Sequence, residues 1–260
     1  MRIALAIEYA GDAFCGWQSQ ASACSVQDAL ERAVGSIAAK RVATVAAGRT
    51  DAGVHATSQI VHLDADVDRP ESAWVRGVNA LLPKAVAVLW AQPVGDDFHA
   101  RFAATARHYT YLLLTRGARP ALLAKRVGWY HASLDVAAMR EGAAHLAGTH
   151  DFSAFRAAEC QAKSPVKSLT RIDVDVQGPL IRFDFSADAF LHHMLRNIVG
   201  SLVYVGASKR PPEWIAQLLA ARDRTRAAPT FAPDGLYLTG ADYPERFALP
   251  NTRRDVAVSL

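Results

Sequence analysis

The chain has 260 residues, of which 51% are hydrophobic, so composition indicates a globular protein with a sizeable core rather than a disordered chain. No apolar run reaches the ~18 residues that a membrane-spanning helix needs, and the alternating, soon acidic amino-terminal residues are unlike a secretory signal. The formal net charge of +4 favours an acidic partner only weakly, because an Arg-rich composition can have other origins. The three cysteines, Cys15, Cys24 and Cys160, lack CxxC spacing, which predicts a reduced, cytoplasmic protein without a disulfide framework or a zinc ribbon.

The first half of the chain mixes predicted strands with two predicted helices. The segment RIALAIEY places Ile3, Leu5 and Ile7 on one face, which predicts a half-buried strand over residues 2–9. A helix is expected to begin at Ser25, because Ser25 and Asp28 form a capping-box-like start and apolar residues recur after them at helical spacing. The other elements predicted here are a strand over residues 59–63, a helix over 71–82, and strands over 86–94 and 105–114.

The second half follows the same pattern after an interruption. Gly117 and Pro120 break the periodicity, so a boundary is predicted near residues 116–123. We therefore expect an amino-terminal half over residues 1–116 and a carboxyl-terminal half over residues 117–260. The second half is predicted to contain a helix over 135–147, a hairpin over 169–186, helices over 189–206 and 211–222, and a closing strand over 236–238.

Neither half shows the regular strand–helix alternation of a parallel βαβ array. That absence favours the α+β class, with a largely antiparallel sheet and helices on one face.

Basic and aromatic residues gather in one part of the chain. No acidic residue occurs between Asp97 and Asp135, whereas six arginines and lysines do. Cations that bind phosphates and rings that stack on bases are together typical of a nucleic-acid groove, although a solvated basic face has the same composition. The cations of this stretch are Arg101, Arg107, Arg116, Arg119, Lys125 and Arg126, and the aromatic residues among them are His108, Tyr109, Tyr111, Trp129 and Tyr130.

The ten residues AGRTDAGVHA, 47–56, concentrate polar side chains on a permissive backbone. Their two glycines allow a turn that a Cβ would obstruct, and the loop follows a strand-like segment, where reactive groups are commonly displayed. A zinc site is not expected, because Asp51 and His55 have no cysteine nearby, and His192 and His193 are adjacent instead of four residues apart. The chain also lacks the GxxxxGK[ST] loop that cradles phosphates.

One carboxylate with arginine support is what remains in this loop. An aspartate is a competent nucleophile while ionised, and a neighbouring arginine favours that state. The alternative is that Asp51 caps the loop by accepting backbone amides, which is common for aspartate beside glycine.

The loop and five further segments resemble the TruA family of pseudouridine synthases, which isomerise uridine to pseudouridine in the anticodon arm of tRNA. GRTDAGVHA is similar to the signature loop of that family, and the matching segments occur in family order from residue 3 to about residue 243. The departures are mild: Ala10 and Asp12 replace the usual Asp and Thr, and Leu195 stands where Val is frequent. The other five segments are YAGDAFCGWQ, FHARFAATARHYTY, DFSAFRAAECQAKSPVKSLTRI, FLHHMLRNIVG and APDGLYL.

The resemblance implies a role for each matching residue. Asp51 would be the catalytic aspartate, and Arg49 would organise the loop and engage the backbone of the flipped nucleotide. Tyr109 would stack on the target base and is a candidate base for proton removal from C5. Arg196 would pair with Asp51, and Leu236 would close the apolar wall of the pocket. We also expect Arg101, Arg107 and Tyr111 to bind the RNA substrate.

The resemblance also implies an architecture and partners. The fold would consist of two RRM-like (ferredoxin-like) halves that form one continuous, mainly antiparallel sheet with flanking helices and a central cleft. The protein would be a homodimer that binds tRNA and modifies uridines 38, 39 and 40. From the residues themselves we expect a cytoplasmic protein that requires no metal or other cofactor and does not associate with membranes.

Two other functions fit part of the sequence. A non-catalytic RNA-binding or chaperone module would explain the charge and the aromatic residues but not the Gly-Arg-Thr-Asp loop. A hydrolase that uses Asp51 and His55 as an acid–base pair would release a product or cleave RNA, whereas an isomerase leaves chain length and mass unchanged.

Overall fold

A computed structural model describes residues 1–257 of the 260 and divides them into two compact units. Unit 1 comprises Met1–Arg107 together with the carboxyl-terminal segment from Tyr237 onward, and unit 2 comprises His108–Leu236. The boundary predicted at residue 116 lies nine residues from this division, and the prediction did not include the return of the chain to unit 1. The reason is a long-range strand pairing, since Tyr237 and Leu238 pair in parallel with His55 and Ala56.

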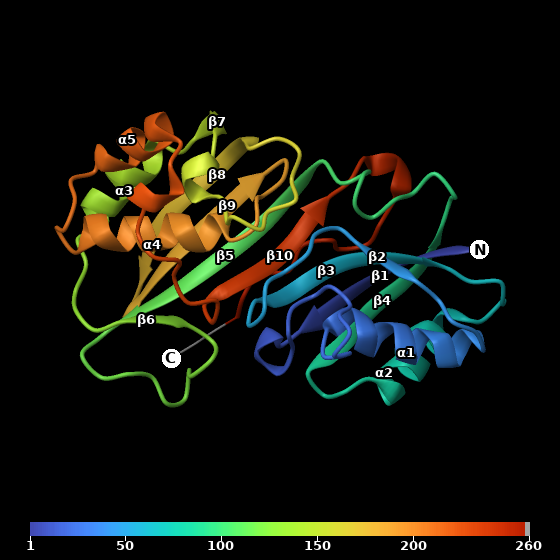
Figure 1. Cartoon of the computed structure of the whole chain (residues 1–260). Helices are drawn as coiled ribbons and strands as arrows, with labels where there is room; N and C mark the ends of the chain where they lie inside the picture. The colour runs from blue at the N-terminus through green and yellow to red at the C-terminus, as the bar shows by residue number, and fades with distance from the viewer. Residues whose placement is uncertain (258–260) are drawn as a thin grey trace. The chain divides into compact units, whose positions relative to one another are not determined.

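Unit 1 is an antiparallel sheet with one parallel strand and helices packed on it. Its strand order is β4-β1-β3-β10, and β2 pairs with β3 as well. Figure 1 shows α1 and α2 side by side next to these strands. The elements are β1 (Arg2–Tyr9), α1 (Val26–Ala38), β2 (Thr44–Ala46), β3 (His55–Asp64), a π-helical turn (Ala73–Gly77), α2 (Val78–Leu81), β4 (Val86–Val94) and β10 (Leu236–Asp242).

Local sequence explains where α1 begins and how β1 is buried. Ser25 caps α1 in a complete capping box with Asp28, as predicted. Strand β1 is buried on both faces and not on one. Ala4 and Ala6 pack with Ile60 in a hydrophobic cluster on one face, and the larger side chains of the strand fill the opposite face. Alternating large and small apolar residues therefore mark a central strand here.

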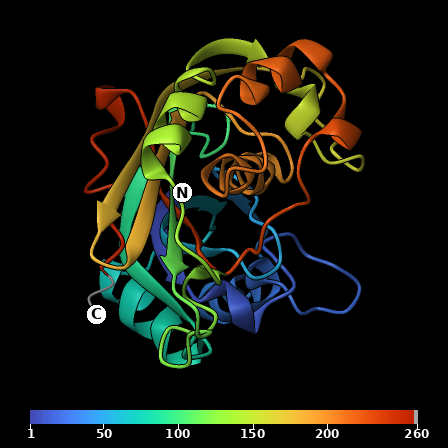
Figure 2. The same cartoon turned by 90° about the vertical axis from the view of Figure 1, so that its left-hand side faces the viewer.

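Unit 2 has its own mainly antiparallel sheet, in the order β5-β9-β8-β7, with β6 parallel to β5. Helix α3 contacts both β8 and α4 (Figure 1), and Figure 2 shows the orange α4 to one side of the gold strands β8 and β9. The elements are β5 (Ala106–Thr115), β6 (Gly128–Tyr130), α3 (Val136–Ala144), β7 (Gly148–Asp151), β8 (Val166–Gln177), β9 (Leu180–Ala187), α4 (Met194–Gly206) and α5 (Trp214–Ala221). Single 3₁₀ turns occur at Gly11–Ala13, Ser153–Phe155, Arg224–Arg226 and Glu245–Phe247.

The four helices predicted after residue 70 are all shorter than expected, and two of them show a clear reason. The helix predicted from residue 189 begins at Met194, because His193 adopts a left-handed conformation with φ of 60° that helix geometry does not tolerate. The helix predicted over residues 71–82 is a π-helical turn followed by one short α-helical turn. Both segments have apolar periodicity, but backbone conformation sets their limits.

The predicted fold class is confirmed. The described residues form a mixed α+β structure with mainly antiparallel strands and five α-helices. The continuity of the sheet through both halves and the central cleft stay predictions. Within residues 1–257, no helix is long and apolar enough to cross a membrane.

The expected lack of a disulfide was wrong. The sulfur atoms of Cys15 and Cys24 are bonded, nine residues apart in sequence. The backbone N–H of Cys15 also donates a hydrogen bond to the carbonyl of Cys24, so the segment between them closes on itself. Cysteine spacing alone did not reveal this, because the pair becomes adjacent only through the fold of the loop before α1.

Acid is expected to destabilise unit 1 through His62. Burial lowers the pKa of this ring to about 4, and the positive charge of Arg2 adds to the effect. The ring Nδ1 accepts a hydrogen bond from the backbone N–H of Ala100 at 3.1 Å, which a protonated Nδ1 cannot do. Since the pKa in the unfolded chain is about 6.5, this contribution is complete above that pH and is lost as the pH falls toward 4.

Urea unfolding at pH 7 and pH 5 measures this effect. The free energy of unfolding should fall by up to about 2 kcal/mol over that interval on account of His62, and His62→Gln should remove that part of the pH dependence. The matched control is His131→Gln, since His131 is exposed in unit 2. An equally steep loss in His62→Gln would show that other groups cause the acid sensitivity.

Candidate active site

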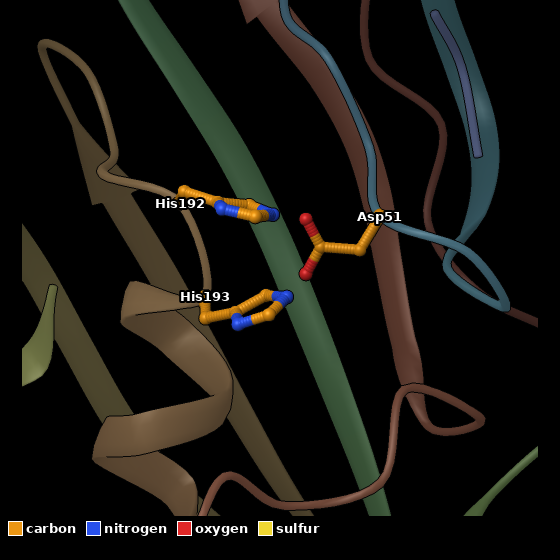
Figure 3. Close-up of side chains that lie close together, drawn as sticks. All are labelled: Asp51, His192 and His193. Atoms are coloured by element: carbon orange, nitrogen blue, oxygen red, sulfur yellow. The ribbon is translucent and has the colours of Figure 1, made fainter. Parts of the chain in front are cut away.

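Asp51 lies in the loop that joins β2 to β3 in unit 1, as predicted. Its side chain is half-buried, and Figure 3 shows it projecting from this loop. The backbone N–H of Val54 donates to the carbonyl of Asp51 at 3.1 Å, which closes a tight turn. Gly53 within this turn has φ of +82°, a conformation that favours glycine. The glycine in the motif is therefore needed for the geometry that presents the carboxylate.

The residue before Asp51 is fixed on two sides. The carbonyl of Thr50 accepts a hydrogen bond from the backbone N–H of Trp17 at 3.0 Å, and the Thr50 hydroxyl lies 2.8 Å from the hydroxyl of Tyr9. Burial raises the pKa of Tyr9, so its hydroxyl keeps its proton and this hydrogen bond persists at neutral and moderately basic pH. Thr50 thus anchors the backbone of Asp51 to β1 and to the loop before α1.

The start of the same loop is held by two side chains. Gln59 donates from Nε2 to the carbonyl of Gly48 at 2.6 Å. The guanidinium of Arg107 donates to the carbonyl of Ala47 at 3.1 and 3.2 Å. These bonds satisfy carbonyl groups that the short strand β2 leaves unpaired, so the loop is held at both ends.

The loop that follows β1 packs directly on the Asp51 turn. The backbone N–H of Gly11 donates to Nδ1 of His55 at 3.0 Å. A Cβ added to Gly11 would lie 1.9 Å from the carbonyl oxygen of Val54, and one added to Gly16 would lie 3.0 Å from the carbonyl oxygen of Thr50. Both positions require glycine because backbone approaches backbone there.

The geometry of His55 disfavours the hydrolase alternative. The ring is 2% exposed and stacks on Tyr237 at a centroid distance of 4.7 Å. Because its Nδ1 is committed to the Gly11 amide, His55 is a structural residue that positions the loop. A buried ring in that role is poorly placed to exchange protons with a substrate.

The arginines predicted in unit 1 differ in accessibility. Arg49 and Arg101 are exposed. Arg107 is half-buried, and besides Ala47 its guanidinium donates to the carbonyls of Ala104 and Arg101. Arg107 therefore braces the protein backbone, whereas Arg49 and Arg101 lie at the surface of unit 1.

In unit 2, Tyr109 lies on β5, and its ring meets Phe190 edge-to-face at 5.1 Å. The side chain is 8% exposed, so Tyr109 is a buried residue of this strand. An edge-to-face neighbour fixes the plane of the ring, which a residue that stacks on a base needs.

Arg196 and the two histidines before it lie at the start of α4. Nε of Arg196 donates to the carbonyl of Phe231 at 2.9 Å, and the backbone N–H of Phe231 donates to the carbonyl of Arg196. The rings of His192 and His193 are 3.9 Å apart (Figure 3). These bonds orient the Arg196 side chain within unit 2.

Tyr111 and Leu236 are packing residues of unit 2. Tyr111 is fully buried against Phe183 and Phe231, and its hydroxyl donates to the carbonyl of Ala232 at 2.8 Å. A side chain without exposed surface does not touch RNA, so the direct contact expected of Tyr111 does not fit this geometry. Leu236, which is 5% exposed at the start of β10, fits an apolar wall.

Comparison with known proteins extends these observations to nearly the whole chain. A family model described as tRNA pseudouridine synthase matches residues 5–103 and 143–244. The chain is also 66% identical to tRNA pseudouridine synthase A of Chromobacterium violaceum, with 96% of each chain covered. It is 60% identical to the protein of that name from Thiobacillus denitrificans, with 97% of each covered, and 57% identical to that from Paraburkholderia phytofirmans, with 96% of this chain and 92% of the relative covered.

The chain belongs to the tRNA pseudouridine synthase family. The family predicted from the six ordered segments is thereby confirmed, and pseudouridine synthases are isomerases. Membership disfavours a non-catalytic RNA-binding module, which would have no need of the Gly-Arg-Thr-Asp loop.

Sequence reasoning missed the residues that hold the loop of this pseudouridine synthase. Tyr9, Gln59 and the two glycines Gly11 and Gly16 act through hydrogen bonds and close backbone approach. Gly11 and Gly16 lie within the matched segment YAGDAFCGWQ, so a signal was present. What it did not reveal is that this segment packs on the aspartate loop.

Proposed function

We propose that this protein isomerises uridine to pseudouridine at positions 38, 39 and 40 in the anticodon arm of tRNA, with Asp51 as the catalytic carboxylate. The observation that carries the proposal is the Asp51 loop. In a chain of the tRNA pseudouridine synthase family, backbone and side-chain hydrogen bonds fix Gly48, Thr50 and Val54, while the Asp51 side chain is left half-buried. A carboxylate held in this way is preorganised for reaction.

The reaction requires a carboxylate more than any other group. The N1–C1′ bond of uridine breaks, the base turns, and a C5–C1′ bond forms, after which the C5 proton leaves and N1 gains a proton. No electrons are gained or lost, so no oxidant or reductant takes part. Asp51 serves as the nucleophile or base that opens the first bond, in its ionised form.

Tyr109, Arg196, Leu236 and Arg49 are proposed to serve the same reaction. A uridine must leave its stack before an enzyme reaches C1′ or C5, which costs a few kcal/mol. Stacking on Tyr109 would return ~1–3 kcal/mol of that cost. Arg196 would pair with the catalytic carboxylate, Leu236 would supply apolar wall, and Arg49, which is exposed, would engage the nucleotide backbone.

The tRNA backbone is proposed to meet exposed cations, among them Arg101. Arg107 contributes by holding the backbone of Ala47 and Arg101, and Tyr111 by packing beneath the surface. We further propose a homodimer in the cytoplasm that needs no metal. Conversion that is undiminished in EDTA would support the last point.

Mapping of pseudouridine in a tRNA transcript tests the function. A transcript with uridines at 38, 39 and 40 is incubated with the protein in EDTA, treated with carbodiimide, and read by primer extension. Stops at these three positions, lost when each uridine is replaced by cytidine, are expected. Stops elsewhere would contradict the site, a shortened RNA would indicate a hydrolase, and binding without stops would indicate an RNA-binding module.

A further inference from the structure

One aromatic ring of unit 1 is far more exposed than the others. Phe102 is 77% exposed, although exposed phenylalanine has an unfavourable contact with water. It lies in the segment FHARF, residues 98–102, between β4 and β5. The first ring of that segment, Phe98, is fully buried against Tyr243 and Phe247, so the segment is anchored while its last ring faces solvent.

The exposed ring is held in place from behind. His99 stacks on Phe102 at a centroid distance of 4.3 Å with an interplanar angle of 28°. Nδ1 of His99 accepts the backbone N–H groups of both Arg101 and Phe102 at 3.2 Å, and its ring contacts that of His62 at 4.8 Å. His99 therefore covers one face of the Phe102 ring, and a further planar group that stacked on Phe102 would extend this stack.

The charge around this ring suits an anion. The guanidinium of Arg101 lies 5.7 Å from the centre of the Phe102 ring, and Arg101 is itself exposed. From residue 98 to residue 134 the sequence has no acidic residue. A ring for a base beside a cation for its phosphate is the combination that single-stranded nucleic acid binds.

The ring is also linked to the Asp51 loop within unit 1. Arg107 donates to the carbonyl of Arg101, next to Phe102, and with the same guanidinium to the carbonyl of Ala47, where the loop begins. One side chain thus fixes both the exposed ring and the start of the catalytic loop.

We propose that Phe102 is a stacking site for an unpaired nucleobase of the RNA substrate, with Arg101 on the adjoining phosphate. The inference rests on the proposed function, since it names a further contact for the same substrate. A protein partner is disfavoured because the neighbours of the ring are a histidine and an arginine instead of an apolar patch.

A series of substitutions at position 102 tests the proposal. The dissociation constant of a full-length tRNA transcript is measured for the wild type and for Phe102→Trp, Phe102→Leu and Phe102→Ala. Loss of the ring should weaken binding by about 10-fold or more, in Leu as in Ala, whereas Trp should bind at least as tightly as Phe. The matched control is Leu81→Ala, because Leu81 is also exposed in unit 1 and should not affect binding.

Two further readouts separate this proposal from its alternatives. At saturating tRNA the single-turnover rate of Phe102→Ala should equal that of the wild type, since the ring binds but does not react. Equal affinity of Phe102→Leu and the wild type would overturn the proposal, and so would a change of oligomeric state in Phe102→Ala, because the ring would then contact another protein chain. A wild type that binds tRNA but forms no pseudouridine would contradict the proposed function and leave the affinity series interpretable.

Discussion

Asp51→Asn is expected to lower the rate of pseudouridine formation by roughly 10⁴-fold or more while tRNA binding stays within a few-fold of the wild type. Asparagine has nearly the same shape and keeps the Val54–Asp51 backbone bond, so the loop geometry survives. What the variant loses is the negative charge and the ability to accept a proton or form a covalent bond. The lower rate of Asp51→Asn would therefore come from the lost chemistry of the carboxylate and not from misfolding.

Single-turnover release of tritium from tRNA transcripts labelled at uridine C5 measures this effect, together with filter binding of the same transcripts. A matched control is Asp66→Asn, since Asp66 is an exposed aspartate of unit 1 that pairs with Lys40. A rate of Asp51→Asn above a tenth of the wild-type rate would show that Asp51 is not catalytic. Asp51 would then be a residue that caps the loop by accepting backbone amides, as aspartate beside glycine commonly does.

Gly11→Ala is expected to have the second largest effect, although Gly11 is not part of the signature loop. Its added Cβ would lie 1.9 Å from the carbonyl oxygen and 2.4 Å from the carbonyl carbon of Val54. These are backbone atoms that cannot swing aside, so the turn that carries Asp51 must move. A displacement of that kind is expected to lower the single-turnover rate by about 10²-fold and to destabilise the protein by a few kcal/mol.

Gly117→Ala is the control for this substitution, because a Cβ at Gly117 would have nothing within 4 Å. The rate is measured at a temperature at which thermal unfolding shows both variants to be folded. Wild-type activity in Gly11→Ala would show that the loop tolerates displacement, contrary to the rigid anchoring inferred from Thr50, Gln59 and Arg107.

Local patterns predicted the parts of this fold that depend on neighbouring residues. The capping box at Ser25 and Asp28 set the start of α1, and the glycines around Asp51 indicated a tight turn, because both effects act within a few residues. The family was recognisable for the same reason, since its motifs are short and occur in order.

Features that depend on distant residues were not predictable in this way. The parallel pairing of Tyr237 with His55 joins residues 182 positions apart and moves the carboxyl-terminal segment to unit 1. We expected Tyr111 and Arg107 to contact RNA because they lie in a stretch of the chain that is rich in basic and aromatic residues. In the structure Tyr111 is a buried residue whose hydroxyl donates to the carbonyl of Ala232. Arg107 supports the Asp51 loop by donating to the carbonyl of Ala47.

Pseudouridine in tRNA from living cells shows whether Asp51 carries the reaction. Cells that lack their own enzyme of this family are given the wild-type gene or the Asp51→Asn gene, and their tRNA is mapped after carbodiimide treatment. The wild type should restore pseudouridine at positions 38 to 40, and Asp51→Asn, produced at an equal level, should restore none. Restoration by Asp51→Asn, or none by the wild type, would contradict the proposed function.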